Sequence, residues 1–145
     1  MKVYIAGPLF NDGEKRFNER IDGIIRECGH ETYLPQRDGG VIAEMPETVN
    51  GVSKYEYVFK ADLKHLQDCD LFLFLMDGRV PDEGASFAMG YAYAHGKRCA
   101  AYKTDARTAM NGEDNLMLKQ AVERVMRNEE ELRAFFGGEA IGNRQ

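Results

Sequence analysis

The sequence has few cysteines and no long hydrophobic run. Its three cysteines, Cys28, Cys69 and Cys99, are scattered without a CxxC spacing, which excludes a disulfide framework and disfavours a zinc site. The longest apolar run, 71–76, is far shorter than the roughly 20 residues that a membrane helix needs. The N-terminal residues enter a strand pattern directly, so no signal peptide is visible. We therefore expect a cytoplasmic protein that has no membrane partner.

The chain also lacks an excess of positive charge. Lysine and arginine total 19 against 24 aspartates and glutamates, and the net charge is -5. A general nucleic-acid binder needs a basic surface, so nucleic acid is not an expected partner, although a small nucleoside-like ligand stays possible. The three histidines show no metal-binding spacing, and no Gly-x-Ser-x-Gly motif is present. Neither a metal site nor a serine hydrolase is expected.

The remaining composition is that of an ordinary globular protein. With 145 residues, 43% of them hydrophobic, the chain is long enough for one domain with a core. We expect this domain over residues 1–136 and a flexible tail over 137–145. The apolar patterns predict strands at 2–6, 31–34, 70–76 and 98–102, and helices at 12–28, 53–67, 83–95, 115–126 and 129–136, with 36–50 irregular. This alternation predicts an α/β fold, a parallel sheet with helices on both faces.

Ligands bind parallel α/β sheets at the carboxyl ends of the strands, so the loops there are the first candidates for a site. In the first loop, Gly7 lets the backbone approach a ligand and Phe10 could stack on a flat ring, although a turn with Phe10 in the core is the more ordinary interpretation. In the second, Gln36 can donate to and accept from a base edge. Arg37 and Asp38 could equally form a surface ion pair.

The third loop leads into a helix that is poor in charge. Asp82 stands near the helix N-terminus, where it is either a cap or a carboxylate that binds a hydroxyl group at the mouth of a pocket. The weakly charged helix after Gly84 is expected to be buried or shielded by a partner subunit. Asp62 lies on another helix, and an ordinary solvated aspartate is its default interpretation.

These features occur in one order along the chain. The order is Tyr4-Ile5-Ala6-Gly7-Pro8-Leu9-Phe10, Leu34-Pro35-Gln36-Arg37-Asp38, Asp62, Asp82-Glu83-Gly84 with Gly90 beyond, and Asn115-Leu116-Met117. Over about residues 2–118 this set resembles the nucleoside 2-deoxyribosyltransferase family. The resemblance implies a flavodoxin-like or Rossmann-like sheet of about five strands. It also implies transfer of 2-deoxyribose between nucleobases without a cofactor, by two displacements through a glycosyl-enzyme that retain configuration.

The resemblance also implies a role for each matching residue. Tyr4 matches a tyrosine that hydrogen-bonds the nucleophile, Asp62 a carboxylate that helps to protonate the base, and Asp82 a carboxylate near the sugar hydroxyls. The matching substrate-binding positions are Gly7, Phe10, Gln36, Arg37, Asp38 and Gly84. Asn115 and Met117 match residues that complete a neighbouring subunit's site. The implied partners are therefore deoxynucleosides, free nucleobases and further copies of the chain.

One position departs from the family pattern. The family has its nucleophilic glutamate six residues after the aspartate and two before the glycine, and here that position holds Ala88. A methyl group cannot attack an anomeric carbon. Glu83 is no substitute, because five residues of helix separate it from position 88 and turn it roughly 140° away. We therefore expect the chain as written to bind a nucleoside without transferring its sugar.

Two explanations for Ala88 stay open at this point. Either a glutamate has been replaced by engineering, or a natural member has become a non-catalytic nucleoside-binding module. The presence of Tyr4, Asp62 and Asp82 favours the first explanation. A further alternative, an N-glycosidase of 2′-deoxynucleoside 5′-monophosphates, needs phosphate donors in the first loop. Residues 8–12 are instead apolar and then acidic.

Overall fold

The computed structural model describes residues 1–138. From residue 139 onward, the predicted flexible tail lies outside the described residues. Within the described part of the chain, no helix is both long enough and apolar enough to cross a membrane.

The core of the fold is a five-stranded parallel sheet. Its strands are β1 (Lys2–Ala6), β2 (Glu31–Tyr33), β5 (Leu71–Leu75), β6 (Arg98–Tyr102) and β7 (Val125–Met126). Their order across the sheet is β2-β1-β5-β6-β7. Numbered by their appearance in the chain, the strands follow the 2-1-3-4-5 order of flavodoxin-like sheets. The predicted α/β class is confirmed.

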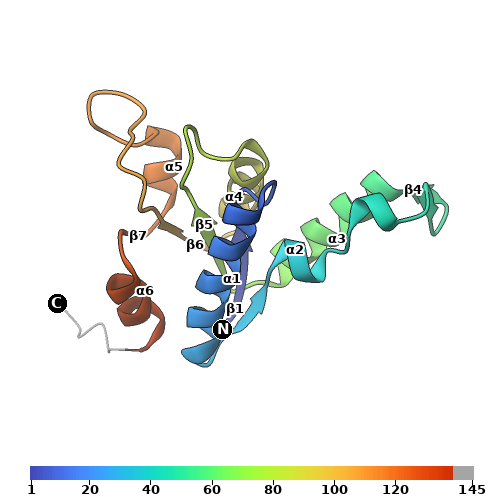
Figure 1. Cartoon of the computed structure of the whole chain (residues 1–145), viewed down its shortest axis with the longest axis horizontal. Coiled ribbons are helices and arrows are strands. Elements are labelled where there is room, and N and C mark those ends of the chain that lie inside the picture. Colours follow the sequence, from blue (N-terminus) through green and yellow to red (C-terminus); the bar gives the residue numbers. More distant parts are fainter. Residues whose placement is uncertain (139–145) are drawn as a thin grey trace.

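Helices cover both faces of this sheet (Figure 1). The helices α1 (Asp12–Glu27) and α6 (Glu129–Phe136) pack on one face, and α3 (Lys54–Asp68) and α4 (Glu83–Ala94) pack on the other. The side chains of β5 alternate between the two cores, and none is more than 1% exposed. Because β5 is buried on both sides, its sequence is apolar without interruption.

The segment between β2 and α3 is more regular than the sequence predicted. It contains α2 (Pro35–Asp38), a 3₁₀ helix η1 (Ile42–Glu44) and a hairpin of β3 (Thr48–Val49) and β4 (Val52–Ser53). The hairpin turn is Asn50-Gly51, and both residues have positive φ, as tight hairpin turns require. Figure 1 shows the hairpin and the start of α3 projecting beyond the sheet.

The predicted helix over 115–126 is wrong in its second half. The helix α5 (Leu116–Ala121) ends early, and Val125 and Met126 form the fifth strand, which pairs with Ala101 and Tyr102 of β6. Met126 is fully buried in the core that α1 and α6 cover. A strand of two residues has no period of its own, so the sequence pattern could not separate it from a helix.

Candidate active site

A cavity of about 310 Å³ opens beside the carboxyl end of β1 and reaches between α3 and α4. Seven of the residues predicted for the site line it: Tyr4, Gly7, Phe10, Asp62, Asp82, Gly84 and Ala88. The cavity lies where the chain order of the strands reverses, between β1 and β5. Ligands of doubly wound sheets bind at this point, and the volume is in the range of small-molecule sites.

The first loop is held close to β5 by Gly7. A Cβ atom at this position would lie 2.8 Å from the Cβ atom of Leu75, so no larger residue fits without a shift of the loop. Phe10 follows with 75% of its surface exposed, and it lines the cavity instead of entering the core. Its backbone N–H donates to Glu14 Oε2 at 2.7 Å. The loop therefore presents an aromatic ring to the cavity.

Asp62 comes from α3 and is not a solvated surface aspartate. The Tyr33 hydroxyl donates to Asp62 Oδ1 at 3.0 Å. Burial raises the pKa of Asp62, and this effect outweighs the lowering by the Tyr33 and Tyr4 hydroxyls and by His65. A carboxyl group with a raised pKa is suited to donate a proton near neutral pH.

Tyr4 of β1 is 3% exposed and lines the floor of the same cavity. Its pKa is raised, first by burial and then by the neighbouring Asp62 and Tyr33. The phenol therefore stays neutral and can act as a hydrogen-bond donor to a group in the cavity.

The helix α4 supplies Asp82 and Ala88. Asp82 is the N-cap of α4, and its Oδ2 accepts from the N–H of Ala85 at 2.8 Å. It also lines the cavity, so the residue that caps the helix stands at the wall of a pocket. Ala88 faces the cavity from the second turn, whereas Glu83 is exposed and does not line it. Glu83 therefore brings no carboxylate to the part of the cavity that Ala88 lines.

Two aromatic residues of the site escaped the sequence analysis. Phe59 of α3 and Phe87 of α4 line the cavity with ring centroids 6.1 Å apart. They are 49% and 58% exposed. Phe59 precedes Asp62 by three residues on the same helix, a spacing that places both side chains on one face and could have revealed it.

Three predicted residues do not line the cavity. The Gln36 amide donates to the Lys15 carbonyl at 3.0 Å and accepts from Asn18 at 2.9 Å, so its side chain is bound to α1. Arg37 donates to Asp22 at 2.8 Å and to Asp38, and Asp38 accepts from the N–H of Leu34 at 2.9 Å. These contacts, with a hydrogen bond from Arg37 to the Thr32 carbonyl at 2.9 Å, hold α2 against α1 and β2.

Asn115 and Met117 also lie away from the cavity of their own chain. Asn115 is the N-cap of α5, and its Oδ1 accepts from the N–H groups of Met117 and Leu118 at 3.0 and 3.3 Å. Met117 is 72% exposed. Neither residue contributes to the lining of the cavity between α3 and α4.

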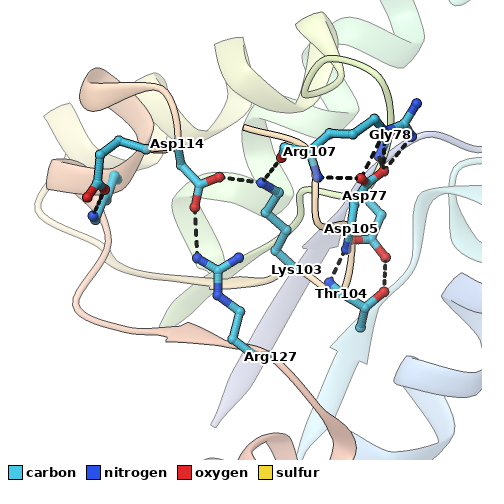
Figure 2. A network of polar contacts seen from close by, with 10 residues as sticks. Asp77, Gly78, Lys103, Thr104, Asp105, Arg107, Asp114 and Arg127 are labelled. Atoms are coloured by element: carbon cyan, nitrogen blue, oxygen red, sulfur yellow. Dashed lines mark hydrogen bonds and ion pairs between the residues drawn. The ribbon is translucent and has the colours of Figure 1, made fainter. Parts of the chain in front are cut away.

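A polar network joins the loops that follow β5 and β6 (Figure 2). Asp77 accepts from the N–H groups of Thr104 and Asp105 at 2.7 and 2.8 Å, and Asp105 accepts from the N–H of Gly78 at 3.1 Å. The segment that leads to Asp82 is therefore fastened at its start to the loop after β6.

A match to a known family shows to which group of proteins the chain belongs. The family model for nucleoside 2-deoxyribosyltransferase matches residues 3–125. The chain belongs to this family. A search of the curated proteins gives no match. The members of the family are pentosyltransferases.

Solved structures show the same fold. The chain is similar to a 2-deoxyribosyltransferase from Bacillus psychrosaccharolyticus, with a TM-score of 0.72, 21% identity, and coverage of 92% of this chain and 90% of that one. It is similar to a 2-desoxiribosyltransferase from Leishmania mexicana, with a TM-score of 0.67, 20% identity, and coverage of 97% and 99%. A CMP N-glycosidase from Clostridium botulinum also matches, with a TM-score of 0.61, 20% identity, and coverage of 93% and 97%.

Proposed function

We propose that this chain binds a 2′-deoxynucleoside between α3 and α4, in a site built to transfer 2-deoxyribose from one nucleobase to another. The observation that carries the proposal is the joint lining of one cavity by Tyr4, Asp62 and Asp82 in a member of this family. Exposed aromatic rings at the same cavity offer flat surfaces on which a base can stack.

Each lining group has a chemical task in this proposal. Asp62 protonates the departing base, and Asp82 binds the sugar hydroxyls. Tyr4 donates a hydrogen bond to the nucleophile that belongs at position 88. Ala88 supplies no nucleophile, so this chain binds the nucleoside and does not form the glycosyl-enzyme. Because the other three groups are in place, we infer that Ala88 stands where a glutamate has been replaced.

The first loop favours a nucleoside over a nucleoside 5′-monophosphate. The N–H of Phe10 is already bound by the Glu14 carboxylate, and the Asn11 side chain caps α1. Asp12 and Glu14 add negative charge to the first turn of α1. A phosphate would meet these anions instead of free N–H donors, which disfavours the N-glycosidase alternative.

Binding by the chain as it stands is the direct test of the site. We expect a 2′-deoxynucleoside to bind saturably, without release of its base, in isothermal titration followed by chromatography. Asp82→Asn keeps a side chain that caps α4 but removes the charge, and should weaken binding about tenfold, since a hydrogen bond to a charged group contributes about 1.5–3 kcal/mol.

Glu83→Gln is the matched control, because Glu83 is the next residue and is exposed outside the cavity. It should leave the affinity unchanged. Absence of binding, or an equal loss in both variants, would contradict the proposed site.

We also propose that the chain forms a homo-oligomer in which Asn115 and Met117 complete the cavity of a neighbouring subunit. Leu116 and Met117 are 68% and 72% exposed, a large apolar surface for one helical turn. Met117→Asp should shift the protein toward monomers and weaken nucleoside binding, as measured by analytical ultracentrifugation and by titration. A monomeric starting protein that binds nucleosides would refute the shared site.

A further inference from the structure

Tyr33 contacts Asp62 but lies outside the cavity between α3 and α4. It is the last residue of β2, and its hydroxyl donates to Asp62 Oδ1 at 3.0 Å. It lines a neighbouring cavity of about 450 Å³ together with His65, and it is not among the residues that line the cavity between α3 and α4. Tyr33 therefore contacts the carboxyl group without contacting the volume in which a nucleoside would lie.

The ring of Tyr33 packs against two other rings. It stacks on the His65 ring with centroids 3.9 Å apart and an interplanar angle of 19°. Its centroid lies 5.0 Å from that of Tyr4, the residue opposite it in the parallel pairing of β1 and β2. Because this packing fixes the orientation of the ring, the Tyr33 hydroxyl group approaches Asp62 from a fixed direction, and the hydrogen bond is preorganised.

We propose that Tyr33 is a positioning residue that determines which oxygen of Asp62 carries the proton for the leaving base. A hydroxyl group that donates to Oδ1 makes this oxygen the acceptor, so the proton of the neutral carboxyl group resides on Oδ2. The inference rests on the proposed function, in which Asp62 acts as the acid.

The proton transfer balances in this arrangement. As the bond between the anomeric carbon and the base breaks, its electron pair stays on the base nitrogen. The base takes the proton from Oδ2, and Asp62 is left as a carboxylate. The Tyr33 hydroxyl then donates to a charged oxygen, a stronger interaction than with a neutral one. Tyr33 would thus aid the step in which Asp62 gains its charge.

The groups around Asp62 determine its titration. Tyr4 faces it from β1, Tyr33 from β2 and His65 from α3 itself, while Asp82 of α4 lines the same cavity. The hydrogen bond from Tyr33 lowers the pKa of Asp62, because it stabilises the charged form. Removal of that hydroxyl group should therefore raise the pKa of Asp62.

The first test uses the chain as it stands. The Asp62 carboxyl carbon is followed by ¹³C NMR through a pH titration. Tyr33→Phe keeps the stacked ring and should move the Asp62 midpoint to higher pH. Tyr91→Phe is the matched control, since the Tyr91 hydroxyl accepts from Gln67 at 2.6 Å and should leave the midpoint in place. An unchanged midpoint in Tyr33→Phe would overturn the inference.

The second test separates positioning from a structural role. In an Ala88→Glu background, Tyr33→Phe should lower kcat/KM about tenfold for 2′-deoxyadenosine, whose base needs a proton, since acid catalysis contributes a hundredfold or more. It should change kcat/KM less than twofold for 7-methyl-2′-deoxyguanosine, whose cationic base leaves without one. Equal losses would show a structural role and overturn the inference. A shifted midpoint with an inactive Ala88→Glu protein would instead refute the proposed function.

Discussion

Replacement of Ala88 by glutamate is expected to raise the rate of base exchange by roughly a thousandfold or more over the chain as it stands. Position 88 is on the second turn of α4 and faces the cavity that Tyr4 and Asp62 line. A glutamate there would bring a carboxylate into that cavity. The neutral Tyr4 phenol could then donate to the carboxylate and orient it for attack.

The measurement incubates each protein with a deoxynucleoside and a different free base, and follows the new nucleoside by chromatography. Mass spectrometry of Ala88→Glu should show an added deoxyribosyl group, and the product should keep the configuration of the substrate. Ala88→Gln is the matched control, because it has the size and polarity of glutamate without a nucleophilic carboxylate. It should give no more base exchange than the chain with Ala88.

Three outcomes would contradict this expectation in different ways. Prompt exchange by the chain as it stands would mean that the nucleophile is not at position 88. A folded Ala88→Glu protein that binds nucleosides but exchanges no bases would refute the proposed transferase function. Hydrolysis of the nucleoside in place of exchange would favour an N-glycosidase.

Asp114→Asn is expected to lower the free energy of unfolding by about 3–5 kcal/mol, the usual result of removing one partner of a buried ion pair. Lys103 and Asp114 each have side chains that are only 5% exposed, and they form an ion pair (Figure 2). Arg127 donates to the other oxygen of Asp114 at 2.8 Å. With asparagine at 114, the buried Lys103 ammonium group would have no carboxylate partner.

Denaturant unfolding measures this loss of stability, and the size of the loss should depend on pH. Burial alone would raise the pKa of Asp114, but the hydrogen bonds from Lys103 and Arg127 lower it below its ordinary value of 3.8. The stabilisation by Asp114 is therefore present above the unfolded pKa and is lost as pH falls through the lower, folded pKa. The difference between the two proteins should shrink below about pH 4.

Glu123→Gln provides the comparison with an exposed pair. It breaks the ion pair of Arg98 and Glu123, whose side chains are 48% and 37% exposed. This change should cost less than about 1 kcal/mol. A similar loss of stability in Asp114→Asn and Glu123→Gln would show that burial does not determine how much the pair of Lys103 and Asp114 contributes.

Local sequence patterns were sufficient for much of the fold. The apolar run at 71–76 predicted a strand, and the structure has it as β5, buried along its whole length. The helix predicted over 53–67 corresponds to α3, and Ser53 is its N-cap, whose hydroxyl group accepts from the N–H of Glu56. The order of the motifs along the chain also indicated the family, which the match over residues 3–125 confirms. Local patterns depend on neighbouring residues and motif order on the sequence alone, so both can be recognised without a structure.

Other features were decided by contacts between distant segments. Met126 joins the sheet because β6 offers an edge and α6 closes the core over it. The side chain of Gln36 turns to Asn18 of α1, away from the cavity. The Tyr33 hydroxyl donates to Asp62, although the two residues are 29 positions apart in the sequence. Such contacts depend on which elements pack together, and side-chain direction depends on the available partners, so only the tertiary structure determines them.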